Sequence, residues 1–503
     1  MRIGRKLGSL ALVLMVVACE RSPETITGNA PRPSMATATS TAAATSPQAT
    51  IGINVLLKGP ATAAQLAQLN TLGTVTDQIP ELNALLMATK AGNLPLIQAL
   101  SYVAGANPDA ERGDAPLDVL AVSDFTGGLS TWDMDAINVT VSPFTPTRNT
   151  STFTGDGVYV GVLDTGLLDN WRSYFPAERI ATQFAIAFQG GGGAMNKGAV
   201  PSQPNVWEHD QNSHGTHVTS TIIGYSLGTT PINGVAPKAK IIPVKVLKQS
   251  GFGWSSMIAR GIVYITDLKM AGQLGARPAV INMSLGGPNL DVVEKAAIDL
   301  AVANGVIIVA AAGNAGTQGM GFPGAYEPVI SVAAVGWTGQ WVTHHFGSGA
   351  LAVFCNSSRN WWLCGDVADP TNPSDFYIAP FSSRELPGQH LDVAAPGAWT
   401  VGPYQLNSGS RLTYFFLSGT SMATPHVAGI VALMAQKDPA LTAPLAETIL
   451  EGSALRLAPG SRMITNPNGS TSTVSWGLVG SDAGLNATGA GLVQADAALA
   501  ATP

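Results

Sequence analysis

Three residues whose types cooperate in hydrolysis stand far apart in the chain, each within a short motif. Asp164 ends "VGVLD", His214 lies in "NSHGTHV", and Ser421 lies in "SGTSMATPHVAG". A serine hydroxyl attacks a carbonyl only when a base takes its proton, and histidine is the usual base because its pKa lies near neutrality. An aspartate beside the imidazole fixes its tautomer and stabilises its charged form. The three residue types together predict acyl transfer through a serine nucleophile.

Hydrolysis through a serine also needs hydrogen-bond donors for the oxyanion, and the sequence offers two. Asn314 ends "VAAAGN" and carries a side-chain amide, while the backbone N–H of Ser421 is a second donor. "GTSMATPHVAGIVALMAQ" predicts a buried helix that begins at Ser421, and a helix N-terminus favours developing negative charge. Pro425 is expected to cost that helix little, because the first amides of a helix lack partners within it.

The elements that position these residues follow from hydrophobic patterning. Near-continuous apolar strands that alternate with helices indicate a doubly wound parallel α/β sheet with flanking helices. In such a sheet the functional side chains lie at the carboxyl ends of the strands, where Asp164 and Asn314 fall. The apolar runs of strand length are residues 157–164, 239–247, 278–286, 305–314 and 328–336.

A smaller domain is expected before the sheet. Residues 20–50 are rich in Ser, Thr, Ala and Pro and nearly free of large apolar side chains, which predicts a flexible linker. Residues 51–112 show a β-α-β-β-α-β order, with Thr62 as the N-cap of the first helix and Gly73 at its end. This order predicts a ferredoxin-like α+β domain, and the pattern alone assigns it no function.

Residues 1–19 have the features of an export signal. Arg2, Arg5 and Lys6 form a basic start, and the apolar segment after them is shorter than the about 20 residues that span a bilayer. The tetrapeptide "VVAC" is similar to a bacterial lipobox, whose cysteine is lipidated. We therefore expect lipidation of Cys19; the alternative is an ordinary signal peptide cleaved nearby.

Five motifs together resemble the signature blocks of the subtilisin-like serine proteases: "VLDTG", "NSHGTHV", "VINMSLGGP", "AAAGNAGT" and "SGTSMATPHVAG". Their Asp, His, Ser order is the order of that family. The resemblance covers about residues 120–500 and implies a subtilisin-like peptidase domain over residues 113–503. It implies a serine endopeptidase with Asp164, His214 and Ser421 as its triad and Asn314 as its oxyanion donor.

The resemblance also implies a substrate cleft. One strand would pair with the substrate backbone and line the S1 pocket, a second would form the opposing edge, and a glycine at the floor of S1 would favour a large apolar P1 residue. Trp254 is the candidate wall of S4. The implied substrate-binding residues are Ser284, Leu285, Gly286 and Gly287 on the first strand, Gly251, Phe252 and Gly253 on the second, and Gly321 at the floor.

By the same resemblance, residues 51–112 are an inhibitory propeptide that assists folding and is then removed by autoprocessing between about residues 112 and 130. The propeptide would be the intramolecular inhibitor of a monomeric enzyme, and its other partners would be protein or peptide substrates. The precursor would be anchored to the cell envelope through its lipid, at the outer membrane if the host is Gram-negative, or the mature enzyme would be released from the cell.

The chain departs from the family between residues 337 and 381, where an insertion is much longer than the usual connection. Cys355 and Cys364 stand nine positions apart in it, which predicts a disulfide-closed loop in an oxidising compartment. The family's main calcium site is only weakly supported, because residues 225–237 carry no Asp or Glu and leave backbone and Asn233 oxygens as ligands. No cofactor is expected to take part in the chemistry.

Other classes of function are weighed by composition and by residue pattern. The net charge is −6 with 26 Lys and Arg, and the chain lacks a basic run beyond its first residues, which argues against nucleic-acid binding. His209, His214 and His217 are close in sequence, but no HExxH motif or companion cysteine accompanies them, which argues against zinc. The alternative from another class is a surface-anchored binding protein with a vestigial protease site, whose disulfide loop engages a partner.

Overall fold

The computed structural model describes residues 46–113, 118–121, 131–140, 148–150, 152–193, 206–227, 230–342, 367–405, 412–478 and 480–503. The expected signal peptide, its Cys19 and most of the linker lie outside the described residues, as do Cys355, Cys364 and residues 343–366 of the insertion. Among the helices that the structure describes, none is long and apolar enough to span a membrane.

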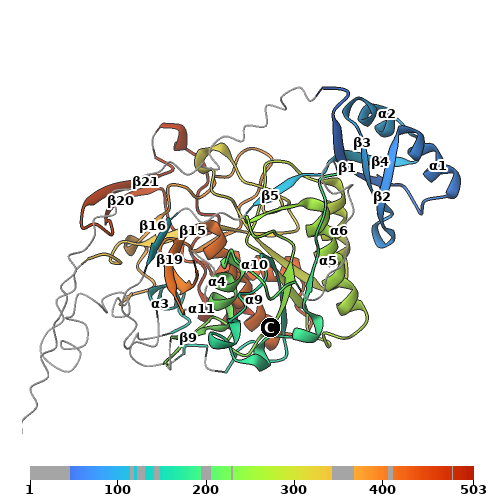
Figure 1. The fold of residues 1–503 in the computed structure, drawn as a ribbon. Coiled ribbons are helices and arrows are strands. Elements are labelled where there is room, and N and C mark those ends of the chain that lie inside the picture. The colour runs from blue at the N-terminus through green and yellow to red at the C-terminus, as the bar shows by residue number, and fades with distance from the viewer. Residues whose placement is uncertain are drawn as a thin grey trace, which may run out of the picture. The chain divides into compact units, whose positions relative to one another are not determined.

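A central sheet of eight strands runs in the order β16-β15-β14-β13-β7-β11-β8, with β17 paired to β15 (Figure 1). Every described pairing in it is parallel except that of β15 with β16. This confirms the predicted parallel α/β sheet. The strands are β7 (Tyr159–Asp164), β8 (Ile186–Ala187), β11 (Lys240–Lys245), β13 (Ala279–Met283), β14 (Val306–Ala311), β15 (Ile330–Trp337), β16 (Phe376–Ile378) and β17 (Val393–Pro396).

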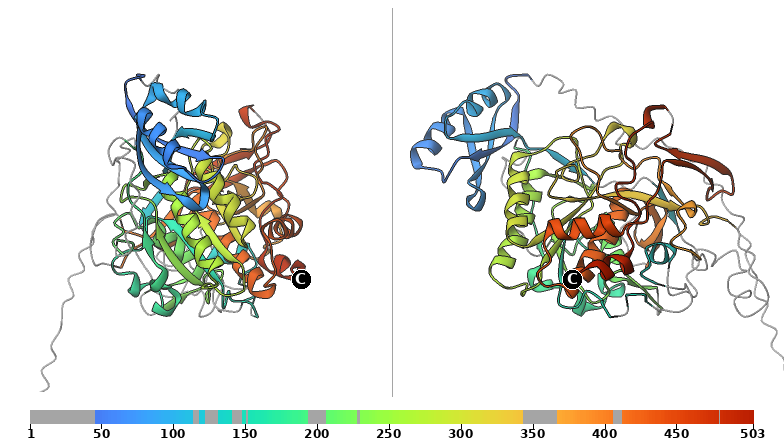
Figure 2. Two further views of the ribbon diagram at one scale, coloured as in Figure 1. Left: turned by 90° about the vertical axis from the view of Figure 1, so that its right-hand side faces the viewer. Right: turned by 180° about the vertical axis from the view of Figure 1, so that it is seen from behind.

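Both faces of the sheet are covered by helices, which is why its strands are apolar throughout. On β14, Ile307 and Val309 belong to one hydrophobic cluster, and Ile308 and Ala310 belong to another. The first cluster includes α4 (His214–Ile223) and α9 (Thr420–Lys437), and the second includes α5 (Ser255–Met270) and α6 (Val292–Ala303), two helices that run side by side (Figure 2). Successive side chains of a strand point to opposite faces, so each face receives half of them.

The segment before the sheet forms a four-stranded antiparallel sheet in the order β2-β3-β1-β4. Thr62 caps α1, and Thr62 and Gln65 form a reciprocal capping box. Buried side chains such as Ile53, Leu69 and Met87 form its core. Its elements are β1 (Thr50–Leu57), α1 (Ala63–Leu72), β2 (Gly73–Ile79), β3 (Ala84–Lys90), α2 (Leu94–Gln98) and β4 (Val103–Pro108).

Smaller elements complete the described chain. β5 (Glu111–Gly113) pairs with β12 (Phe252–Trp254), and β6 (Asp118–Ala121) joins β18 (Thr400–Pro403) and β19 (Tyr414–Ser418). The remaining elements are β9 (Tyr225–Leu227), β10 (Thr230–Ile232), β20 (Gly460–Thr465), β21 (Thr471–Trp476), α3 (Trp132–Ala136), α10 (Ala443–Ser453) and α11 (Ala495–Ala501).

Candidate active site

A buried aspartate and a buried histidine meet at the carboxyl end of the sheet. Asp164 is the last residue of β7, and His214 is the first residue of α4. His214 Nδ1 lies 2.9 Å from Asp164 Oδ1 and 3.0 Å from Oδ2, and both side chains are fully buried. A carboxylate at this distance holds the imidazole in one orientation and favours the tautomer protonated at Nδ1.

Asp210 links the segments that carry these two residues. Its Oδ2 accepts hydrogen bonds from Thr165 Oγ1 at 2.8 Å and from the Ser213 backbone N–H at 2.9 Å. Thr165 follows Asp164 directly, and Ser213 precedes His214 in a left-handed conformation with φ 77°. Burial raises the pKa of Asp210 to about 6, although the nearby Lys245 lowers it. The contact of Asp210 with Thr165 depends on the fold, because the two residues are 45 positions apart in the chain.

Ser421 is the second residue of α9, and it exchanges two hydrogen bonds with Ser284. Its Oγ donates to the Ser284 carbonyl at 3.1 Å, and Ser284 Oγ donates to the Ser421 carbonyl at 2.8 Å. Pro425 is the sixth residue of α9 and so lies beyond the first amides, which lack partners within the helix. The expected reason why this proline destabilises the helix little is therefore wrong. Its missing N–H would have bonded the carbonyl of residue 421, and that carbonyl instead accepts from Ser284 Oγ.

Asn314 reaches the start of the same helix. Its Oδ1 accepts hydrogen bonds from the Thr420 backbone N–H and from Thr420 Oγ1, both at 2.9 Å. A Cβ atom on Gly419 would lie 3.6 Å from Asn314 Nδ2, so the amide nitrogen lies beside the turn into α9. The side-chain N–H₂ of Asn314 is therefore presented at the helix N-terminus that carries Ser421. Thr420 was not predicted from the sequence; its backbone N–H and hydroxyl donate to the carbonyl oxygen of the Asn314 amide.

The residues expected to bind substrate lie on segments that flank residues 111–113. Gly287 and Phe322 exchange backbone hydrogen bonds of 2.8 and 2.7 Å, which ties the Ser284–Gly287 segment to the segment of Gly321. The β5 strand lies between this segment and β12. Gly113 exchanges two 3.2 Å hydrogen bonds with Gly286, while Arg112 pairs with Gly253. The two segments expected to form the edges of the substrate site thus both pair with the same extended segment of the chain, β5.

The side chains at these edges differ in exposure. Phe252 is an exposed large apolar side chain, and a Cβ atom on Gly113 would contact its ring. Leu285 is buried in the hydrophobic cluster that includes residues of α5 and α6. A Cβ atom on Gly321 would lie 3.4 Å from the Gly287 carbonyl oxygen. The indole of Trp254 lies against Gly191 and Gly192.

The loop proposed for calcium does not fit that ion well. The described residues of 225–237 offer one amide side chain, Asn233, and no carboxylate. The carbonyl groups of Gly234 and Val235 accept hydrogen bonds of 2.7 and 2.5 Å from the Arg148 guanidinium. Calcium prefers six to eight oxygen ligands that include carboxylates. In this loop an arginine binds two of the available carbonyl oxygens.

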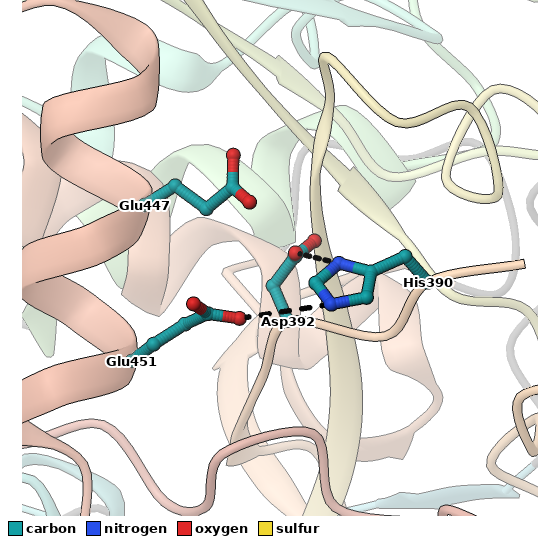
Figure 3. A group of neighbouring side chains, drawn as sticks. All are labelled: His390, Asp392, Glu447 and Glu451. Atoms are coloured by element: carbon teal, nitrogen blue, oxygen red, sulfur yellow. Dashed lines mark hydrogen bonds and ion pairs between the residues drawn. The ribbon is translucent and has the colours of Figure 1, made fainter.

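Among the described residues, one other cluster has metal-ligand side chains. His390, Asp392, Glu447 and Glu451 bring ligand atoms within 4.8 Å of one another (Figure 3). His390 Nδ1 lies 2.8 Å from Asp392 Oδ1, and burial together with neighbouring carboxylates raises the pKa of Glu447 to about 7. The cluster shares no residue with the Asp164, His214 and Ser421 site. Within the part of the chain that the structure describes, this is the group whose ligand atoms lie close enough together to hold a metal ion.

Comparison with known proteins shows the family of the chain. Residues 155–478 match the model of the subtilase family. The chain is 33% identical to subtilisin DY of Bacillus licheniformis over 309 residues, which are 61% of this chain and 86% of that protein. It is 34% identical to subtilisin Savinase of Lederbergia lenta over 340 residues, which are 67% of this chain and 94% of that protein.

A solved structure shares the fold over most of the chain. The crystal structure of fervidolysin from Fervidobacterium pennivorans, described as a keratinolytic enzyme related to subtilisin, matches with a TM-score of 0.61 at 23% identity. The match covers 91% of this chain and 62% of fervidolysin. The family match, the two subtilisins and the shared fold lead to one conclusion: the chain belongs to the subtilase family and is a subtilisin-like serine endopeptidase.

Proposed function

We propose that the chain hydrolyses peptide bonds through an acyl-enzyme formed on Ser421. His214 takes the proton of the Ser421 hydroxyl as the oxygen attacks the carbonyl, and then delivers that proton to the leaving amine. Asp164 keeps His214 in the required tautomer and stabilises the imidazolium. The observation that carries this proposal is the fully buried pair in which Asp164 lies 2.9 Å from His214 Nδ1.

The tetrahedral oxyanion would be stabilised by two donors at the start of α9. One is the backbone N–H of Ser421, and the other is the Asn314 side-chain amide, whose carbonyl oxygen Thr420 holds at 2.9 Å. Donors that are fixed before the reaction need no reorganisation as charge develops. The N-terminus of α9 adds a favourable dipole. Every group in this scheme is a protein side chain or backbone amide, so we propose that no cofactor takes part in the chemistry.

The position of β5 supports a zymogen. Residues 111–113 lie between the two expected substrate-binding segments as a bound peptide strand would, and they stand at the end of the domain of residues 51–112. We propose that this domain is an inhibitory propeptide, removed by autoprocessing between about residues 112 and 130. The mature enzyme would act as a monomer on protein substrates, with a broad preference for large apolar P1 residues.

Export completes the proposal. The lipobox-like segment at Cys19 favours a lipid-anchored precursor outside the cytoplasm, and removal of the propeptide would release the enzyme from that anchor. The Cys355–Cys364 disulfide is proposed on the same grounds, because it would form in an oxidising compartment.

Replacement of the nucleophile tests the function. Ser421→Ala is expected to abolish casein hydrolysis and to leave a precursor that does not process itself, because alanine cannot form the acyl-enzyme. Ser461→Ala, which changes an exposed serine of β20, is the matched control and is expected to keep both activities. Normal casein cleavage by Ser421→Ala would refute the proposed nucleophile. A vestigial site would leave the unaltered chain inactive as well.

A further inference from the structure

The cleft contains a fully buried ion pair that the proposed chemistry does not use. Arg112 of β5 and Glu294 of α6 have no exposed side-chain surface, and Arg112 Nε donates to Glu294 Oε1 at 3.1 Å. Arg112 Nη2 donates to Glu294 Oε2 in the same pair. This is the planar, two-bond geometry by which arginine and carboxylates recognise each other.

The strand register identifies which substrate position Arg112 occupies. Gly113 pairs with Gly286, so a residue two positions further along an antiparallel peptide would pair with Ser284. Ser284 is the residue whose carbonyl accepts the Ser421 hydroxyl at 3.1 Å. A peptide carried in this register would therefore place its P1 residue opposite Ser284 and its P3 residue where Gly113 lies. Arg112 is then in the P4 position.

The contacts of Arg112 do not depend on the small domain that precedes it. Two hydrogen bonds go to Glu294, and Nη2 also donates to the Asn289 carbonyl at 3.2 Å. Nη1 donates to the Glu111 carbonyl at 2.9 Å, and Glu111 is the preceding residue of the same strand. A substrate would supply that last carbonyl from its own P5 residue, and the peptidase domain supplies the rest.

Gly287 lies close against the Arg112 side chain and the strand that carries it. A Cβ atom on Gly287 would lie 3.0 Å from Arg112 Nη1 and 2.4 Å from the Glu111 carbonyl oxygen. Because glycine has no side chain, position 287 leaves room for the β5 strand and for the guanidinium of Arg112. An apolar P4 side chain in the same place would leave the Glu294 carboxylate buried without a counter-charge, which is strongly unfavourable.

We infer that Glu294 is the floor of an S4 pocket that selects arginine, so that the mature enzyme prefers peptides with arginine at P4. The inference rests on the proposed endopeptidase function and names the substrate class of that same cleft. The Arg112 of the precursor occupies the pocket first, and substrate arginine replaces it after processing. Lysine is expected to bind less well, because it cannot form the two-bond pair.

The test is a series of internally quenched peptides that differ only at P4 and share Ala-Ala-Phe at P3 to P1. With mature wild-type enzyme, kcat/KM for arginine is expected to exceed that for its neutral isostere citrulline, and for leucine, by about a hundredfold. Mass spectrometry of the products confirms that cleavage follows Phe. Equal kcat/KM values for arginine, citrulline and leucine would overturn the inference and limit the Arg112–Glu294 pair to holding the precursor together.

A substitution then assigns the preference to the carboxylate. Glu294→Gln is expected to reduce the arginine-to-citrulline ratio to within about threefold, because the amide forms no ion pair. Asp299→Asn makes the same chemical change at an exposed position of α6 and is expected to keep the ratio. A ratio that survives Glu294→Gln would refute the role of Glu294. If Glu294→Gln does not mature, the Arg112→Gln/Glu294→Gln double variant supplies a neutral precursor pair for the same measurement.

The outcomes separate this inference from the function on which it rests. Casein hydrolysis with no dependence on P4 leaves the endopeptidase proposal intact and overturns the arginine pocket. Absence of cleavage of casein and of every peptide overturns both.

Discussion

The two buried pairs of this molecule, Asp164–His214 and Glu294–Arg112, differ in where their members stand along the chain. Asp164 and His214 both belong to the peptidase domain, so their contact persists after maturation. In the proposed maturation Arg112 leaves with the propeptide while Glu294 stays in the peptidase domain, so processing would separate that pair. A pair that persists can orient a catalytic group. A carboxylate that loses its guanidinium partner can instead bind a guanidinium from another molecule.

The energetics of the two pairs differ for the same reason. Removing one member of a buried ion pair leaves the other charge without compensation, which costs about 3–5 kcal/mol. For Asp164–His214 only a mutation can do this. For Glu294 the proposed removal of the propeptide takes Arg112 away and opens the carboxylate to water, and a substrate that brings a guanidinium restores the pair.

The largest difference between the catalytic region and the arginine pocket is expected when the oxyanion donor Asn314 is removed. Asn314→Ala should lower kcat by about 10²–10³ for every peptide of the P4 series, because it removes a donor used only in the transition state. The arginine-to-citrulline ratio should not change, since Asn314 has no contact with the Arg112 pocket. Steady-state kinetics on both peptides checks this. A kcat within threefold of the wild type would remove Asn314 from the oxyanion site.

A smaller effect is expected from pH and concerns only the arginine pocket. Burial raises the pKa of Glu294, as do the nearby carboxylates Asp291 and Asp109, and Arg112 lowers it. When the propeptide leaves, the lowering influence of Arg112 and the raising influence of Asp109 are both lost, while Asp291 stays. Protonation of Glu294 removes its charge, so the arginine preference should be full above the pKa of Glu294 in the free enzyme and should be lost as the pH falls through it.

The arginine-to-citrulline ratio isolates this titration, because a change in the catalytic groups affects both peptides equally. We expect the ratio to fall about tenfold or more between the alkaline plateau and the acid end of the active range. Stopped assays over a pH series measure it. A ratio that is constant with pH while both rates change would mean that the charge of Glu294 does not determine the preference.

The sheet, and the ends of strands and helices at which Asp164, His214 and Asn314 lie, could largely be predicted, because they depend on local patterns. Apolar runs that alternate with helices specify a sheet buried on both faces, and Ile307 and Ile308 accordingly belong to opposite clusters. Asp164, His214 and Asn314 follow strands or begin a helix, so their meeting at one edge follows from strand direction.

Glu294 could not be predicted in the same way. In "DVVEKAAIDLAVANG" it is one charged residue of a helix that begins after its N-cap Asp291, where an acidic residue in the first turn is ordinary. Its role depends on the register of β5, which pairs residues far apart in the chain. The link of Asp210 to Thr165 and the bond of Ser284 to the carbonyl freed by Pro425 are likewise long-range contacts.

The most direct test of the central claim is covalent labelling of the mature enzyme with a fluorophosphonate, with the modified residue located by mass spectrometry. Only a serine activated by a base reacts rapidly. We predict one label per chain, on Ser421, with the rate of labelling reduced by about 10⁴ in Asp164→Asn. Labelling of another residue, or an equal rate in Asp164→Asn, would contradict the proposal that Asp164 and His214 activate Ser421.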